Sequence, residues 1–350
     1  TTLPLDPEAW NRPPSIGIGG FAVEPRPGDC GAFWEHVQEV ICAGHPEHYQ
    51  YVRKWMACVV QKPRLLATAL VLRGLQGTGK NRFVEHFGSL FGPYFMTVNS
   101  LNHIAGKFNN HLKYAYLIHA NEATWSGSRK DAGVLKALIT DPIILLEGKG
   151  QDAIQVDNCR HLIISSNEDV PVPMDLDDRR FFALNVSPHR KEDLPYFRKL
   201  EARMASDGKN ALLFDLLHED LCSFDPRTMP VNDHGFDIKL RGADSCEKYL
   251  FEALCEGRFN LATERSGSWE SLPCEFLYQH YKDWCTREGM RYEPSSELGK
   301  VLVRILRVEK ARPSCGGIRV WWYRLPSLEH SRKLFEAHCK QSSGIWLANG

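Results

Sequence analysis

The sequence has few of the features that place a protein in a membrane or outside the cell. No apolar run among its 350 residues approaches the ~20 residues of a transmembrane helix. The first ten residues, TTLPLDPEAW, lack the basic and apolar stretches of a signal peptide. The 11 cysteines include no C-x-x-C pair, which argues against a zinc ribbon or a thioredoxin motif. We therefore expect a cytoplasmic protein with free thiols and no membrane partner.

The sequence also lacks an excess of charge of either sign. Its 43 Lys and Arg residues balance its 43 Asp and Glu residues, so contact with a nucleic acid requires a local basic patch. Hydrophobic residues make up 43% of the chain, as in ordinary soluble globular proteins. The first residue is Thr1 and not Met, and we expect a fragment of a longer protein.

Apolar strand-like segments alternate with amphipathic helical segments in the first half of the chain. The patterns predict strands over 66–74, 94–100, 114–123 and 161–169, and helices over 81–92, 101–112 and 130–141. This alternation predicts an α/β fold with a mostly parallel sheet flanked by helices on both faces. Two further predicted elements are a helical segment over 31–61 and a β-hairpin over 143–156.

The segment LRGLQGTGKN, residues 72–81, has the composition of a phosphate-binding loop between a strand and a helix. Glycines leave backbone N–H groups accessible to a phosphate chain, and the helix dipole adds positive potential. Lys80 supplies a cation for the β- and γ-phosphates. A strand, GxxGxGK and an amphipathic helix in this order predict nucleotide binding. The candidate nucleotide-binding residues are Gly74, Gln76, Gly77, Thr78, Gly79, Lys80 and Asn81.

Two residues that usually help to hold magnesium are missing. Asn81 stands where a phosphate-binding loop has Ser or Thr. Asn121 stands before Glu122, where many such enzymes have Asp. An amide oxygen is still a hard ligand, so we expect Asn81, Asn121 and Glu122 to face Mg²⁺. The loss of a hydroxyl and a carboxylate leaves the strength of ATP hydrolysis open.

Polar side chains also follow the predicted strands at the edge where ligands gather in parallel sheets. Glu122 ends one strand and is the candidate general base that orients an attacking water. Asn167 ends another strand, and its amide can hydrogen-bond the water or the γ-phosphate. Together with Lys80, these residues predict one catalytic site. The alternative for Glu122 is a surface carboxylate at a strand end.

An arginine pair, Arg179-Arg180, lies twelve and thirteen residues beyond Asn167. Either guanidinium is a candidate for stabilising transition-state charge on the γ-phosphate of a neighbouring subunit. The alternative for each arginine is a salt bridge to Asp177 or Asp178. The sequence does not show which of the two reaches the phosphate.

The order of these motifs resembles that of the superfamily 3 helicases, a branch of the AAA+ ATPases. The likeness is greatest to the helicase part of phage and plasmid primase-helicases, and it rests on GLQGTGKN, LIHANEA, LLEGKG, LIISSN and DDRRFF within residues 30–335. The resemblance implies ATP and Mg²⁺ as cofactors and a hexameric ring around single-stranded DNA, with 3′-to-5′ translocation. It also implies that Lys149 on the hairpin lines the pore, and that a primase-polymerase domain or partner accompanies the chain in a bacterial or phage-infected cell.

A separate basic module is predicted from about residue 246. Three helical segments followed by a β-hairpin describe a winged helix. Lys300, Arg304 and Arg307 are spaced i, i+4, i+7 on one face of the third helix. Arg319 lies in the hairpin, and we expect these four residues to bind DNA. The alternative is a solvated face on a protein-interaction module. Trp321 in the hairpin either stacks on bases or belongs to the core.

The predicted domains follow one another along the chain. They are an arm (1–28), a helical oligomerisation segment (29–66), the ATPase core (67–187), a helical lid or connector (188–245), the winged-helix-like domain (246–340) and a tail (341–350). The main functional prediction is an ATP-dependent replicative DNA helicase. Two alternatives stay open. The two asparagines favour a catalytically weak nucleotide-binding scaffold, and the same core would serve another AAA+ motor that acts on protein or duplex DNA.

Overall fold

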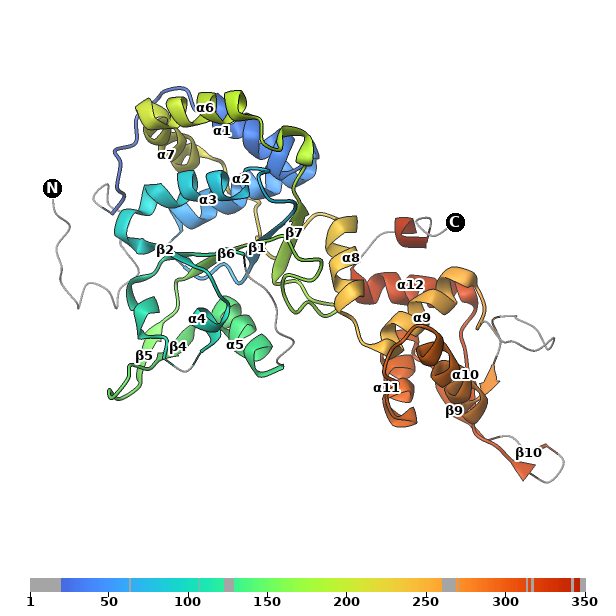
Figure 1. Ribbon diagram of the computed structural model, residues 1–350. Coiled ribbons are helices and arrows are strands. Elements are labelled where there is room, and N and C mark those ends of the chain that lie inside the picture. The colour runs from blue at the N-terminus through green and yellow to red at the C-terminus, as the bar shows by residue number, and fades with distance from the viewer. Residues whose placement is uncertain are drawn as a thin grey trace. The chain divides into compact units, whose positions relative to one another are not determined.

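The chain forms two compact units (Figure 1). The computed structural model describes residues 20–62, 64–106, 108–122, 129–259, 269, 271–312, 314–315, 318–340 and 343–346. The first unit comprises the chain up to Pro173 together with Arg179–Gly235. The second comprises Met174–Asp178 and the chain from Phe236 onward. The segment predicted as one connector, 188–245, is therefore divided between the units.

The first unit is built on a five-stranded parallel sheet of order β2-β3-β6-β1-β7. Its strands are β1 (Ala69–Arg73), β2 (Phe95–Val98), β3 (Leu117–Ala120), β6 (His161–Ser166) and β7 (Phe181–Asn185). The central strands β3 and β6 are buried along their whole length, as strands covered on both faces must be. The predicted α/β fold is confirmed. β7 was not predicted, because its FFALN run follows the arginine pair without a turn signal.

Helices cover both faces of this sheet. α2 (Pro46–Gln61) and α3 (Lys80–Gly88) lie on one face, and α4 (Asn102–Ala105) and α5 (Arg129–Thr140) lie on the other (Figure 1). The core on the α2 and α3 face of the sheet contains aromatic side chains that are at most 1% exposed, namely Phe33, Trp55, Phe83, Phe87 and Phe182. Burial of this apolar surface stabilises the unit, because each such side chain contributes roughly 1.5–3 kcal/mol on leaving water.

Two predicted helices differ from the structure. In place of the helix over 101–112 there are only α4 and a 3₁₀ turn, η4 (Asn110–Tyr114), because Gly106 and the asparagines that follow are poor helix formers. The helix over 81–92 ends at Gly88 and continues as a 3₁₀ turn, η3 (Ser89–Tyr94), which contains Gly92 and Pro93. The predicted hairpin is confirmed as the antiparallel pair β4 (Ile143–Leu146) and β5 (Ile154–Asp157).

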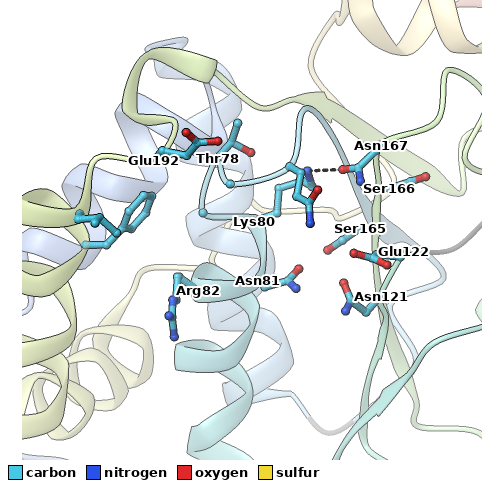
Figure 2. A pocket seen from close by; sticks show the side chains of 15 residues that line it. Thr78, Lys80, Asn81, Arg82, Asn121, Glu122, Ser165, Ser166, Asn167 and Glu192 are labelled. Carbon is cyan, nitrogen blue, oxygen red and sulfur yellow. Dashed lines mark hydrogen bonds between the residues drawn. The ribbon is translucent and has the colours of Figure 1, made fainter.

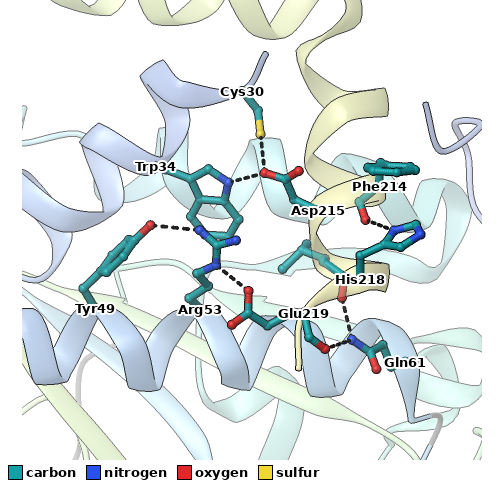
Figure 3. A network of polar contacts seen from close by, with 10 residues as sticks. Cys30, Trp34, Tyr49, Arg53, Gln61, Phe214, Asp215, His218 and Glu219 are labelled. Carbon is teal, nitrogen blue, oxygen red and sulfur yellow. Dashed lines mark hydrogen bonds and ion pairs between the residues drawn. The ribbon is translucent and has the colours of Figure 1, made fainter. Parts of the chain in front are cut away.

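A polar network ties the N-terminal helices to α7 (Lys209–His218) (Figure 3). Asp215 Oδ2 accepts hydrogen bonds from Cys30 Sγ (3.2 Å) and from Trp34 Nε1 (3.0 Å) in α1 (Gly31–Glu35). Arg53 Nε of α2 donates to Glu219 (2.6 Å), and its guanidinium lies 4.6 Å from the centre of the Trp34 ring. Burial raises the pKa of Cys30 to about 12, so this thiol is structural and unreactive.

The second unit consists of helices around a small antiparallel sheet. Its helices are α8 (Asp233–Gly242, most of which belongs to this unit), α9 (Ser245–Glu256), α10 (Cys274–Arg287), α11 (Ser295–Leu306) and α12 (Leu328–Cys339). The sheet order is β8 (Leu272–Pro273), β12 (Trp322–Arg324) and β9 (Glu309–Ala311). β10 (Ser314–Cys315) and β11 (Ile318–Arg319) extend the hairpin between β9 and β12. Tyr281, Leu302 and Phe335 are fully buried in its core.

Two structural features concern the expectations about membrane spans and free thiols. Within the described part of the chain, no helix combines the length and the apolar character needed to cross a membrane. Ten of the described cysteines are free thiols, and six of these ten are buried.

Candidate nucleotide-binding site

The loop between β1 and α3 has a backbone that glycine makes possible. Gly77 and Gly79 adopt positive φ angles of 80° and 93°, which side chains disfavour. A Cβ atom on Gly79 would lie 2.6 Å from His36 Cε1 and 2.7 Å from Phe197 Cε1. Thr78, which is 1% exposed, donates a hydrogen bond to the carbonyl oxygen of Leu75 (2.9 Å). The predicted loop is therefore a rigid turn that leads into the N-terminus of α3.

Lys80, the first residue of α3, is 7% exposed. Its ammonium group donates hydrogen bonds to the carbonyl oxygens of Gly74 (2.6 Å) and Leu75 (2.8 Å) and to Asn167 Oδ1 (3.0 Å). Burial lowers the pKa of Lys80 to about 8, although the charge of Glu122 acts in the opposite direction. Because all three N–H bonds are engaged, a phosphate oxygen that binds Lys80 must replace one of these acceptors.

The ends of β1, β3 and β6 meet around one cavity of about 350 Å³ (Figure 2). Lys80 follows β1, Glu122 follows β3 and Asn167 follows β6, and all three line this cavity. All the predicted loop residues except Gly74 also line it; they are Gln76, Gly77, Thr78, Gly79, Lys80 and Asn81. Gly74 lies at the base of the loop, where its N–H donates to the carbonyl oxygen of Ser166 (3.2 Å). The structure thus brings together residues that are far apart in the sequence.

The residues expected to face Mg²⁺ lie on one side of the cavity. Figure 2 shows the side chain of Asn81 directed across the cavity toward Asn121 and Glu122. Asn121 Oδ1 is buried and has no hydrogen-bond partner among the described residues. An orphaned amide oxygen of this kind suits a hard cation. Within the described ranges, no cluster of three His, Cys, Asp or Glu side chains is arranged to hold a metal.

Glu122 is held in an unusual backbone conformation at the end of β3. Its φ angle is 51°, in the left-handed region that few non-glycine residues adopt. The side chain is exposed to the cavity. The preceding residue, Asn121, donates its N–H to the carbonyl oxygen of Val98 (2.8 Å), which fixes the backbone next to the turn. Strained conformations of this type are often found at functional sites.

Ser165 is a cavity residue that sequence analysis missed. It lies on β6 two residues before Asn167, is 1% exposed, and its Oγ is 2.8 Å from His119 Nε2. Burial lowers the pKa of His119 to about 4, so the imidazole is neutral at physiological pH. The hydrogen bond orients the Ser165 hydroxyl at the edge of the site. In the sequence, the polar run SSN (165–167) at the end of an apolar strand could have indicated this residue.

Residues from distant parts of the first unit also shape the cavity. His36 Nε2 is 3.1 Å from the carbonyl oxygen of Gly79, and burial lowers the pKa of His36 to about 4. Glu192 donates its N–H to the carbonyl oxygen of Gly77 (3.2 Å) and places a carboxylate at the cavity. Leu194 and Phe197, from α6 (Leu194–Arg203), line the same end. No sequence motif marks these residues, since only the fold brings them to the loop.

Arg179 and Arg180 do not reach this cavity in their own chain. They precede β7, and the carbonyl oxygen of Arg180 accepts a hydrogen bond from the N–H of Ala69 (2.7 Å) at the start of β1. β1 and β7 are parallel, and both arginines precede β7. They therefore lie at the N-terminal ends of the strands, whereas the loop follows the C-terminal end of β1. Arg179 is exposed and Arg180 is half-buried.

The predicted DNA-binding residues differ in how far they are already paired. Lys149 is exposed in the turn between β4 and β5. On α11, Lys300 forms an ion pair with Glu297 (2.7 Å), and Arg304 pairs with Glu247 of α9 (2.6 Å). Both side chains are thus already paired with carboxylates in this structure, and their role in DNA binding stays a prediction.

The remaining two residues are solvent-exposed. Arg307 caps α11 with a φ angle of 55°, and Arg319 lies on β11. Burial raises the pKa of Glu247, the acidic partner of Arg304, to about 7. No local motif indicates this pairing, because Glu247 lies on a different helix from Arg304.

The part of the chain that contains this site is similar to known proteins. A family model described only as a family of unknown function, DUF5906, matches residues 72–180, which include the loop, Glu122, Asn167 and the arginine pair. The DNA primase-polymerase of Nitratiruptor phage NrS-1 is 28% identical over 141 residues, or 39% of this chain. The matched part is 20% of that relative, so this chain aligns with about a fifth of its length.

Solved structures extend the likeness to most of the chain. Two structures of the C-terminal region of NrS-1 match with TM-scores of 0.67 and 0.66 at 16% and 15% sequence identity. Each match covers 87% of this chain and 78% of that region. The chain is therefore similar in sequence to part of a phage DNA primase-polymerase, and it has the fold of that protein's C-terminal region.

Proposed function

We propose that this chain is the ATP-dependent DNA helicase part of a phage- or plasmid-type primase-helicase, which translocates on single-stranded DNA. The observation that carries the proposal is the convergence of Lys80, Glu122 and Asn167 from three strand ends on one cavity of about 350 Å³. The similarity to a phage DNA primase-polymerase supports a role in replication. The strand order, with β6 between β1 and β3, agrees with the AAA+ core that the motifs resemble.

Each residue of the cavity has a role in this proposal. The backbone N–H groups of Gly77–Lys80 bind the phosphate chain of ATP, and Lys80 exchanges a loop carbonyl for a phosphate oxygen. Glu122 accepts a proton from the water that attacks the γ-phosphate. Asn167 orients that water or the γ-phosphate. Asn81, Asn121 and Glu122 would hold Mg²⁺, which would supply positive charge to neutralise the phosphates.

The arginine pair motivates a ring of several chains, with six as the expected number. Arg179 and Arg180 lie at the opposite edge of the sheet from the loop of the same chain. An arginine there serves a γ-phosphate only in the cavity of a neighbouring copy, where it would stabilise transition-state charge. In such a ring, Lys149 on the β4–β5 turn faces the central channel and contacts DNA phosphates.

Two alternatives follow from specific residues. Asn81 and Asn121 in place of a hydroxyl and a carboxylate favour a scaffold that binds a nucleotide but hydrolyses it weakly. The exposed basic residues Arg307 and Arg319 are equally suited to a motor that acts on duplex DNA. A single assay separates these functions from the proposed one.

The test is ATP hydrolysis with and without single-stranded DNA. We expect single-stranded DNA to stimulate hydrolysis, and Glu122→Gln to lower turnover by roughly 10²–10⁴-fold while ATP still binds. Glu47→Gln removes an exposed carboxylate of α2 that does not line the cavity, and it serves as the control with retained turnover. Absence of turnover in the unmodified chain with ATP binding intact would favour the scaffold. Turnover that is indifferent to single-stranded DNA would favour the other motor.

A further inference from the structure

One hairpin of the second unit carries several exposed basic residues. We call its described residues between Glu309 and Arg324, from β9 to β12, the wing. Lys310, Arg312 and Arg319 of the wing are exposed, and none of them forms an ion pair with a described residue. On α11, by contrast, Lys300 and Arg304 already pair with acidic side chains. The wing is therefore better suited than α11 to attract an anionic polymer.

An exposed tryptophan lies among these cations. Trp321 is 50% exposed, and the guanidinium of Arg312 lies 5.5 Å from the centre of its ring. Its backbone is fixed, because the carbonyl oxygen of Trp321 accepts a hydrogen bond from the N–H of Cys274 (2.8 Å). The next residue, Trp322, pairs with strands on both sides. A firmly held backbone thus presents a half-exposed indole next to a guanidinium.

Two other exposed aromatic residues of this unit have no described cation over the ring. Phe276 is 43% exposed and Tyr292 is 52% exposed, and no cation from the described residues lies over either ring. A single exposed apolar side chain is common on protein surfaces and needs no explanation. Trp321 differs because an aromatic face and unpaired cations occur together, which is the combination that binds single-stranded nucleic acids.

We propose that the wing binds single-stranded nucleic acid, with Trp321 stacked on an unpaired base and Arg312 and Arg319 on the neighbouring phosphates. A base inside a duplex already has a neighbour on each face, so stacking on Trp321 selects unpaired bases. The inference rests on the DNA contact of the proposed function and is independent of ATP binding. A protein partner would use the same exposed indole but would not require an unpaired base.

The test is the affinity of the full chain for DNA without nucleotide, in a Lys149→Ala background that removes the hairpin lysine of the first unit. The probes are a labelled oligothymidine of about 20 nucleotides, longer than one such binding site, and a duplex with closed ends. We expect Trp321→Ala to weaken oligothymidine binding about tenfold and Trp321→Phe to retain most of it. Tyr292→Ala, a substitution of an equally exposed aromatic residue, should leave the affinity unchanged.

Salt dependence and cross-linking provide further readouts. Arg319→Ala should reduce the slope of log affinity against log salt, whereas Trp321→Ala should leave that slope unchanged, because stacking releases no counterions. An oligonucleotide that carries 5-iodouracil should cross-link to Trp321 on irradiation. Unchanged affinity of Trp321→Ala, or an equal loss on closed duplex DNA, would overturn the proposal. Retained DNA affinity with loss of ATP binding in the Lys80→Ala variant would show that the two sites are independent.

Discussion

The nucleotide cavity of the first unit and the wing of the second unit present their functional groups in opposite ways. In the cavity, Lys80 and Ser165 are at most 7% exposed. Lys80 donates hydrogen bonds to backbone carbonyl oxygens of the loop, and Ser165 Oγ lies 2.8 Å from His119 Nε2. On the wing, Trp321 is 50% exposed, and Lys310, Arg312 and Arg319 form no ion pair with another described residue. A site built from a fixed loop and strand ends selects a ligand by shape, and a change in the backbone of the loop disrupts it. An open site selects by charge and stacking and tolerates backbone change.

The largest expected difference between the two units comes from adding one methyl group to one glycine of each unit. Gly79 in the loop and Gly289 after α10 both have positive φ angles, of 93° and 65°. A Cβ on Gly79 would collide with His36 and Phe197, whereas a Cβ on Gly289 meets nothing within 4 Å. We expect Gly79→Ala to lower the free energy of unfolding by about 2–5 kcal/mol, and Gly289→Ala by about 1–2 kcal/mol.

Denaturant unfolding of both variants, together with ATP titration, measures this difference. Gly79→Ala should also abolish ATP binding, because the loop no longer closes around the phosphates. Gly289→Ala should bind ATP normally. Equal destabilisation by the two substitutions would show that the loop is not the rigid element described here.

A smaller effect distinguishes the two regions by pH. Lys80 has a pKa lowered to about 8 by burial, and a bound triphosphate favours its charged form. ATP affinity should therefore be constant below pH 8 and should fall as the pH rises through 8, by up to about tenfold per pH unit. Binding of oligothymidine by the wing should not follow this pH dependence, because it does not involve Lys80.

Calorimetric titration of ATP between pH 7 and 10 provides the measurement, with oligothymidine binding measured in parallel. The binding of ATP above pH 8 should be accompanied by proton uptake. ATP affinity that stays constant to pH 10 would contradict the assignment of Lys80 to the phosphates.

The sequence predicted the parts of the cavity that depend on strand ends. Lys80, Glu122 and Asn167 each follow a strongly apolar strand, and parallel pairing forces the ends of such strands to the same edge. The convergence could therefore be expected from local patterns alone. The arginine pair lies at the opposite end of the sheet from the loop, and its assignment to a neighbouring subunit stays a prediction.

The parts that the sequence did not predict depend on contacts between distant segments. His36 reaches the carbonyl oxygen of Gly79 and Glu192 reaches that of Gly77 only because α1, α3 and α6 pack together. The charge of Arg304 is compensated by Glu247 on another helix, which a count of charges near α11 overlooks. Such pairings follow from tertiary packing, and no periodicity or local motif encodes them.

The most direct test of the central claim is the affinity of the chain for ATP after Lys80→Ala. Loss of a charged hydrogen-bond donor to the phosphates should weaken ATP binding by roughly 10- to 100-fold. Lys199→Ala, which removes an exposed lysine from α6, should leave binding intact. Unchanged affinity of the Lys80→Ala variant would contradict the assignment of this cavity to a nucleotide.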